Sequence, residues 1–350
     1  MTIYCFLIAF CSIVGYILDR AKKEKDKKIY IFVSILPFLA LFFVSAIRYN
    51  VGTDYAGTYT ELYYAVLNNY KRRRIDIGFY WLLKAIVFCD ANLQMVFVTT
   101  SLIINYFVYK TIQKESKSKA LSYYIYICST FYFFTMNGIR QSIAMALFYY
   151  SLYYANKKNI KKYMLLNIIG ALFHLSALIF IPLYFVFNLK NKKKKKFVIT
   201  LILTYIMSAT ITPVLVKMLS NTKYNLYFMH NNYSALQSFN LSSITNLLLM
   251  IFYIIFTKKD DNIAYILFVC HWMGAEISVF LTSIPLTLRL FESFRFIDFI
   301  SVPYLISGET KLNKKWIRLL IIILYFAYFI YHIGINNANS VLPYQTIWKK

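Results

Sequence analysis

Residues 29–47 read IYIFVSILPFLALFFVSAI, a stretch of 19 residues without a charged side chain. As an α-helix, such a stretch is long enough to cross the roughly 30 Å hydrocarbon core of a bilayer. Similar apolar windows recur along the chain, whose mean hydropathy is +0.53. Helices satisfy their own backbone polar groups inside lipid, and the alternating pattern of membrane strands is absent from the sequence. The sequence therefore predicts an all-α, polytopic integral membrane protein.

Basic residues are concentrated in short clusters between the apolar stretches. Of the 39 Lys and Arg residues, 26 fall at 20–28, 110–119, 157–162, 190–196, 258–259 and 311–318. Cytoplasmic loops of membrane proteins carry such an excess of positive charge. A nucleic-acid site would place base-stacking aromatic residues within the basic runs, and KNKKKKK at 190–196 has none. We therefore interpret the net charge of +25 as a topology signal and expect no nucleic-acid partner.

The charge pattern predicts the order of the spans. With the basic clusters inside, one membrane domain over residues 1–350 has about 12 spans, short re-entrant segments and both termini outside. The predicted spans are 1–18, 29–47, 91–109, 120–136, 142–155, two short helices in 163–188, 197–218, 243–257, 262–282, 297–308 and 317–335. We expect 75–89 to be interfacial or re-entrant. The outer loops are then 48–74, 219–242 and 283–296.

The segment 163–188 has two interpretations. It lies between two basic loops, so two short helices that meet near His174 would take the chain out and back. A single long tilted helix is the alternative, and it would leave consecutive lysines outside. The five cysteines are scattered, and neither a zinc pattern nor a nucleotide-binding loop is present. We expect no metal and no cofactor.

Charged residues near the predicted outer surface are the candidates for function. The loop RYNVGTDYAGTYTE at 48–61 combines Arg48 with flexible glycines and several hydroxyl groups. Arg140 opens a later span, and Arg289 and Arg295 lie in RLFESFRFID. Charge at membrane depth is costly, so such residues are functional by default, and arginine suits phosphate oxygens. In the last motif, however, alternating charges at a spacing of three could simply neutralise one another.

His174, in GALFHLSAL, is the candidate for proton transfer. A histidine in an apolar segment is often a satisfied core residue. Here it lies at the predicted outer tip of a helical pair and is followed closely by Ser176. An imidazole with an ordinary pKa of about 6.5 can accept the proton of a sugar hydroxyl near neutral pH. Both interpretations stay open.

Four sequence blocks resemble a known family. They are RYNVGTDYAGTY at 48–59, IDIGFYWLLKAI at 75–86, NGIRQSIAMALFYYS at 137–151 and ALFHLSALIFIPLY at 171–184. Their order and spacing are similar to those of EpsG-type membrane proteins, relatives of the Wzy-type polysaccharide polymerases. A Pro-Tyr pair at 343–344 agrees as well. Asp76 is a departure, because the family more often has Glu there.

The resemblance implies a metal-independent glycosyltransferase in the bacterial cytoplasmic membrane. Its substrates would be undecaprenyl-pyrophosphate-linked oligosaccharide repeats, joined on the outer face for capsule, O-antigen or exopolysaccharide, and a chain-length regulator is a possible partner. The implied catalytic residues are His174 and Asp54. The implied substrate-binding residues are Arg48, Gly52, Tyr55, Tyr59, Arg140, Gln141, Arg289 and Arg295. Gly57, like Gly52, would let the loop backbone approach the ligand closely.

Two other functions fit parts of the sequence. A flippase or other transporter of lipid-linked oligosaccharides would spread charged residues through the full depth of the membrane. A membrane acyltransferase would also use a histidine but would not need several outer arginines. The 13 Lys and Arg residues outside the basic clusters are predicted to lie toward one side, which favours chemistry at the outer surface.

Overall fold

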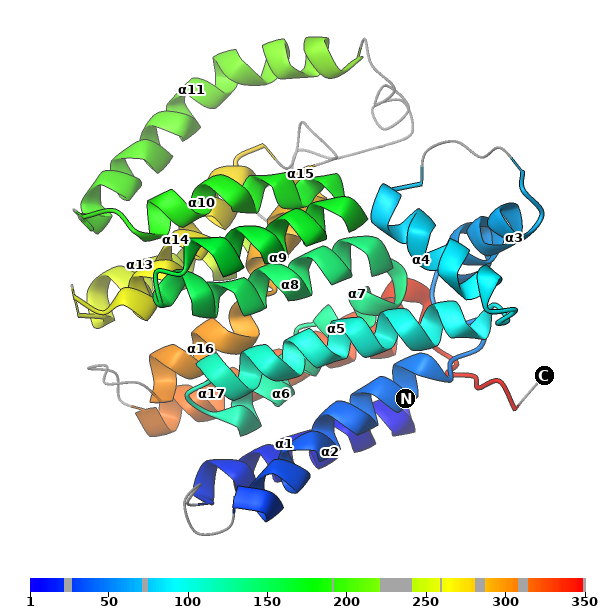
Figure 1. Ribbon diagram of the computed structural model, residues 1–350. Coiled ribbons are helices and arrows are strands. Elements are labelled where there is room, and N and C mark those ends of the chain that lie inside the picture. The colour runs from blue at the N-terminus through cyan, green and yellow to red at the C-terminus, as the bar shows by residue number, and fades with distance from the viewer. Residues whose placement is uncertain are drawn as a thin grey trace. The chain divides into compact units, whose positions relative to one another are not determined.

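A computed structural model describes residues 1–21, 27–70, 75–190, 192–220, 241–258, 260–280, 287–307 and 314–348 (Figure 1). Every regular element in these ranges is a helix, which confirms the predicted all-α class. The chain forms two compact units. Unit 1 contains Met1–Tyr184, Asp298–Gly308 and Asn313–Lys350, and unit 2 contains Phe185–Ile297 and Glu309–Leu312. A single domain over residues 1–350 stays a prediction.

Some of the predicted outer features lie outside the described residues. These are the basic run at 71–74, most of the loop 219–242 and the beginning of the turn 283–296.

Four helical segments are long and apolar enough to cross a membrane: Thr2–Arg20, Lys28–Ala46, Gln94–Glu115 and Lys315–Ile335. They correspond to α1 (Thr2–Arg20), α2 (Lys27–Ala46), α5 (Gln94–Glu115) and α17 (Lys314–Phe329) with η4 (Ile330–Ile335). α11 (Lys194–Ser220) consists of two apolar pieces that are bent by 69° relative to each other. Taken as one membrane span, the two pieces make a fifth candidate. The remaining predicted spans do not appear as long apolar helices in the described residues.

The predicted span at 120–136 is broken into two helices. α6 (Lys119–Cys128) ends before Ser129, and α7 (Phe131–Asn137) begins after Thr130. Thr130 has φ +71°, a left-handed conformation that is rare for a β-branched residue. The segment is therefore helical but broken in its middle, and a membrane span over 120–136 stays a prediction. The apolar run has no glycine or proline to mark the break.

α8 (Ile139–Asn156) and α9 (Ile160–Phe173) pack side by side and run antiparallel. A Cβ atom added at Gly170 would lie 3.4 Å from the Cα of Ala144, so the two backbones are close there. Further along the pair, Asn167 Nδ2 donates to Ser151 Oγ at 3.0 Å. The opposite direction from the Ala144–Gly170 contact leads to Arg140 on α8 and to His174 at the end of α9, each four residues away. Four residues are about one helical turn, so Arg140 and His174 lie at the same level of the pair.

The chain turns back at His174. This residue is extended, with φ −156°, and is followed by η2 (Leu175–Ile179) and α10 (Phe180–Phe187). The hydroxyl of Tyr163 donates to the Phe180 carbonyl at 2.6 Å, so α10 runs back along α9. Two short helices thus meet at His174, as predicted, rather than one long helix.

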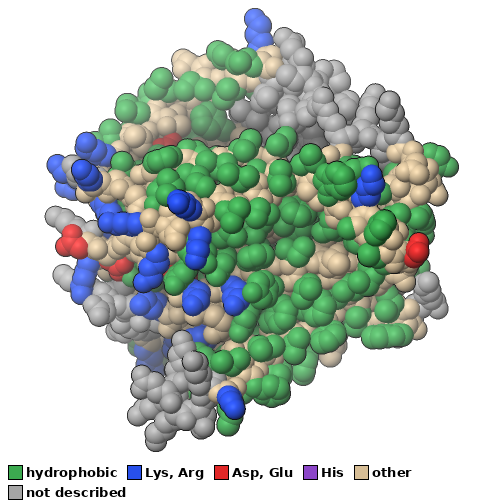
Figure 2. Space-filling view, viewed as in Figure 1, with side chains coloured by type: hydrophobic (Ala, Val, Ile, Leu, Met, Phe, Trp, Pro, Cys, Tyr) green, Lys and Arg blue, Asp and Glu red, His purple; other side chains and the backbone are tan. Residues whose placement is uncertain are grey.

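Unit 1 has a basic end. There Asp19 at the end of α1 accepts hydrogen bonds from Ser118 Oγ at 2.9 Å and from the Lys119 amide at 2.8 Å. The ammonium groups of Lys114 and Lys162 lie over tyrosine rings near the end of α8. Figure 2 shows Lys and Arg gathered at the end where α5 and α8 finish, beside a broad apolar face. The predicted inner clusters of unit 1 therefore share one end.

The C-terminal segment lies at the opposite end of unit 1. Its backbone at 339–347 makes four hydrogen bonds with the backbone at 47–53, including the Tyr49 amide to the Gln345 carbonyl at 3.0 Å. The hydroxyl of Tyr344 donates to the Val44 carbonyl at 2.8 Å. Near the other terminus, the hydroxyl of Tyr4 donates to the Val341 carbonyl at 2.9 Å. Both ends of the chain thus flank the loop 48–61, an arrangement that the sequence did not predict.

The α8–α9 register can be tested with a cysteine pair. A Cβ at Gly170 would be 3.6 Å from the Ala144 Cβ, within the range of about 3.5–4.5 Å that disulfides need. In a background lacking the exposed Cys5 and Cys89, Ala144→Cys with Gly170→Cys should oxidise. Mass spectrometry after alkylation in SDS should then count two fewer thiols than after reduction.

The matched control moves one cysteine by a single residue. Ala144→Cys with Ala171→Cys turns the second side chain by about 100° around α9 and should stay reduced. Full alkylation of the first pair, or equal oxidation of both pairs, would contradict the register that places Arg140 level with His174.

Candidate functional site

Asn137, at the end of α7, anchors the loop 48–61. Its Oδ1 accepts hydrogen bonds from Thr53 Oγ1 at 3.0 Å and from the Asp54 amide at 3.2 Å. Its Nδ2 donates to the Asn339 carbonyl at 2.9 Å. The Asn137 carbonyl accepts from the Tyr59 hydroxyl at 2.6 Å. One buried residue therefore joins the loop, the α7–α8 junction and the C-terminal segment. The sequence did not predict this role of Asn137, although the residue opens the block NGIRQSIAMALFYYS.

Gly52 lies against this anchor. Its φ of +108° is a conformation that other residues rarely adopt, and a Cβ there would come within 2.7 Å of Asn137 Oδ1. A glycine at position 52 therefore allows the loop backbone to lie directly against the Asn137 side chain. Gly57, in the π-helix η1 (Tyr55–Thr60), differs because an added Cβ would meet nothing within 4 Å.

Arg48 lies inside unit 1, with 1% of its surface exposed. Its guanidinium donates to the Ser45 carbonyl at 2.5 Å and to the Met136 carbonyl at 3.3 Å, and its centre lies 4.7 Å from the Phe97 ring centroid. Burial lowers the pKa of Arg48 to about 10, which leaves it charged at neutral pH. These contacts join the end of α2 to the end of α7.

Tyr55 and Tyr59 are also buried. The Tyr55 ring stacks on Phe97, with centroids 4.3 Å apart. The Tyr59 hydroxyl accepts a hydrogen bond from the Ile139 amide at 2.9 Å, and burial raises its pKa to about 12. Both rings therefore pack within the protein and help to fix the loop. Their predicted contacts with sugar stay predictions.

Arg140, unlike Arg48, is partly exposed. It occupies the first turn of α8, and its Nη1 lies 2.6 Å from Asp76 Oδ2. The two side chains are 26% and 19% exposed. Asp76 directly precedes α4 (Ile77–Phe88), so the ion pair connects α4 to α8. The sequence did not predict this role of Asp76, although the block IDIGFYWLLKAI places its carboxylate directly before a helix.

His174 and Asp54 lie near this ion pair. A Cβ on Gly78 would be 3.0 Å from the Leu172 carbonyl, so the beginning of α4 packs against the end of α9. His174 Nδ1 is 2.5 Å from Ser176 Oγ, which orients the ring. The Asp54 amide donates to Asn137 Oδ1, and Asn137 comes three residues before Arg140, so the Asp54 backbone lies beside the beginning of α8. This end of unit 1 therefore gathers an arginine, carboxylates and an imidazole.

The other predicted residues are placed differently. Gln141 is buried in the first turn of α8. Arg289 and Arg295 belong to α15 (Thr287–Arg295) in unit 2, where Arg295 lies over the Phe296 ring at 4.0 Å. Burial raises the pKa of Glu292 to about 7, against the opposing charges of Arg295 and Arg289. A common site for these arginines and the residues of unit 1 stays a prediction.

The two glycines of the loop give a test of its geometry. Gly52→Ala should lower the unfolding temperature and the resistance of the loop to proteolysis, because left-handed backbone costs an alanine about 1–2 kcal/mol even before the clash with Asn137. Gly57→Ala should leave both unchanged or slightly improved, since alanine favours a helical conformation. Equal effects of the two substitutions on both measurements would contradict the described loop.

The comparisons with known proteins give one match. Residues 28–346 match the EpsG family, a range that includes all four motifs and the site residues of both units. The searches of curated proteins and of solved structures gave no match. EpsG is a family of Wzy-like polymerases, membrane proteins of polysaccharide biosynthesis. With its apolar helices and this match over most of its length, the chain belongs to the EpsG family.

Proposed function

We propose that this protein is a polysaccharide polymerase of the bacterial cytoplasmic membrane. It joins oligosaccharide repeats, each carried on undecaprenyl pyrophosphate, on the outer face. The observation that supports this most is the grouping of the Arg140–Asp76 pair, Asp54 and His174 at the end of unit 1 opposite the basic clusters. In the membrane, the complete fold has about 12 spans, short re-entrant segments and an outward-facing cavity.

The reaction transfers the growing chain from its lipid to an incoming repeat. The bond between the anomeric carbon and the pyrophosphate oxygen breaks, and a new bond forms between that carbon and a hydroxyl oxygen of the acceptor. The hydroxyl proton passes to His174 or to Asp54. Undecaprenyl pyrophosphate departs with the bonding electrons and carries the charge that develops.

Arg140 has the properties needed to stabilise this departing charge. A guanidinium has five N–H donors, so it can hold a carboxylate on one edge and phosphate oxygens on another. Asp76 fixes Arg140 before substrate arrives, and a fixed donor need not reorganise as the charge develops. Arg289 and Arg295 are proposed as further ligands of the pyrophosphate.

The buried loop residues have a positioning role. Arg48, Tyr55 and Tyr59 hold the loop against α5, α7 and α8, and Gly52 allows its close contact with Asn137. Asp54 is thereby held near the beginning of α8, where Arg140 lies. Alignment of the two substrates can supply much of the rate, so loss of this support should reduce polymerisation even without a contact to substrate.

Arg140→Ala should abolish long polymer and leave single lipid-linked repeats. Loss of one preorganised donor costs about 10²–10³ in rate. The variants are compared in a deletion strain by the length and amount of polymer at equal protein levels. Arg318→Ala, at the basic end of unit 1, is the control and should polymerise normally. Unchanged polymer with Arg140→Ala would remove this residue from the mechanism.

His174→Ala should lower the polymerisation rate by about 10²–10⁴, the contribution of a general base. Ser176→Ala removes only the partner that orients the ring and should cost less. The initial rate of repeat consumption in isolated membranes measures both. Normal polymerisation with His174→Ala would make His174 a packing residue and leave Asp54 as the base.

The lipid-linked product of the deletion strain separates the three functions. A polymerase defect leaves single repeats outside the membrane, whereas a flippase defect traps them inside. An acyltransferase defect leaves full-length polymer without acyl groups. Accumulation inside, or unacylated polymer of normal length, would overturn the proposal.

A further inference from the structure

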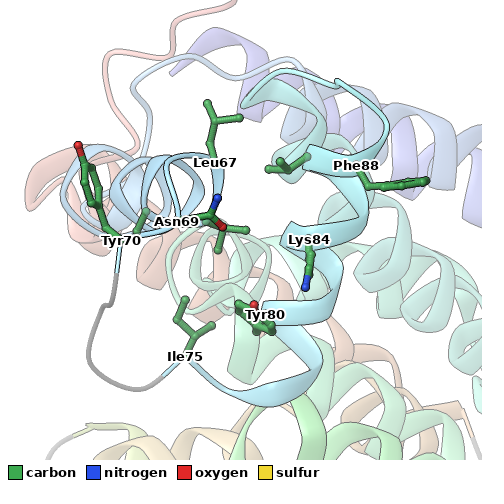
Figure 3. A pocket seen from close by; sticks show the side chains of 10 residues that line it. Leu67, Asn69, Tyr70, Ile75, Tyr80, Lys84 and Phe88 are labelled. Carbon is green, nitrogen blue, oxygen red and sulfur yellow. The ribbon is translucent and has the colours of Figure 1, made fainter.

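A pocket of about 600 Å³ lies between α3 (Glu61–Leu67) and α4. Its walls are mostly apolar, with Leu67, Val87 and Phe88 among the lining residues (Figure 3). The surrounding surface carries large aromatic side chains, since Trp81 is 59% and Phe88 is 87% exposed. Exposed aromatic rings are enriched where a membrane meets water. The pocket therefore has the lining expected for an apolar chain at the membrane interface.

Three polar groups lie at one part of this pocket. The Lys84 ammonium is 5.9 Å from the centre of the Tyr80 ring and 5.3 Å from that of Trp81. Figure 3 shows Asn69 facing Lys84 and Tyr80 across the pocket, with Leu67 at the end away from Ile75. Within the described parts of the chain, no carboxylate pairs with Lys84. Among the described lining residues Lys84 is the cation, and a cation beside an apolar slot suits a lipid that carries a phosphate.

Other ligands match this lining less well. A free phosphate would leave the apolar walls exposed to water, and a neutral acyl chain would leave Lys84 without an anion. The pocket also adjoins the candidate site along the chain. Ile75 lines it, and the next residue is Asp76, the partner of Arg140.

We propose that this pocket binds the isoprenoid phosphate end of the acceptor lipid, an inference that rests on the proposed function. Polymerisation requires two lipid-linked substrates at once. The donor pyrophosphate leaves, so it needs a strong preorganised donor such as Arg140. The acceptor pyrophosphate does not react and needs only to be held, for which a lysine with Tyr80 and Asn69 suffices. Lys84 is a binding residue for this substrate.

The test uses photoreactive undecaprenyl phosphate without sugar, added to the full chain in nanodiscs of zwitterionic lipid. The labelled peptides should come from α3 and α4. Lys84→Ala should weaken labelling about tenfold, the effect of losing one charge-assisted hydrogen bond. Lys84→Arg should restore most of it. Lys110→Ala is the matched control, because Lys110 also lies over a tyrosine ring, Tyr106 at 5.4 Å, outside the pocket.

A second variant keeps the test independent of charge. Leu67→Trp fills the apolar end of the pocket and should reduce labelling while Lys84 is intact. Labelling that is unchanged in both variants, or that phosphatidylglycerol displaces as well as undecaprenyl phosphate does, would overturn the proposal. The first result means that the pocket is not used, and the second means that it binds any anionic lipid.

Kinetics separate this inference from the proposed function. Lys84→Ala should raise the KM for lipid-linked repeats about tenfold with little change in kcat. If the wild-type protein polymerises and Lys84→Ala has the same KM, the proposed role of the pocket is contradicted. The proposed polymerase function is then unaffected. Lys84-dependent labelling of a protein that makes no polymer would support the pocket as an isoprenoid-phosphate site and contradict the polymerase.

Discussion

The hydrogen bonds of Asn137 are the constraint on which the candidate site depends. In a largely apolar protein, polar groups away from water must find partners within the fold. Asn137 supplies them for the amide of Asp54, the hydroxyls of Thr53 and Tyr59, and a carbonyl of the C-terminal segment. A loop rich in glycine and hydroxyl groups is thereby held in one conformation, with the Asp54 backbone beside the beginning of α8.

Arg48 and Arg140 lie in different environments. Arg48 is enclosed, and its contacts with carbonyl oxygens and the Phe97 ring hold helix ends together. Arg140 is partly exposed and paired with Asp76, so it can respond to an anionic ligand. An arginine buried without a carboxylate is costly, and its retention here fits the need for a fixed loop. Both residues are predicted from the sequence to bind substrate, and both roles stay predictions. The contacts differ, because Arg48 is enclosed by the protein and Arg140 is partly exposed.

The apolar windows predicted the helical class, and the basic clusters predicted the shared basic end of unit 1. The break at His174 also followed from charge, because two basic loops flank its segment. The break at Thr130 did not, since no glycine, proline or charge marks it. Pairings over long separations, such as Asp76 with Arg140 or the C-terminal segment with the loop, depend on packing that periodicity does not contain. Short motifs predicted the loop and its glycine but not the residue that anchors it.

The most direct test is polymerisation by the purified protein. Proteoliposomes with the candidate-site end outward would receive undecaprenyl-pyrophosphate-linked repeats from the outside only. The account predicts long polymer outside the vesicles, with one undecaprenyl pyrophosphate released for each new glycosidic bond. Transport of the repeats into the lumen without bond formation would contradict it, as would polymer formed without release of the lipid pyrophosphate.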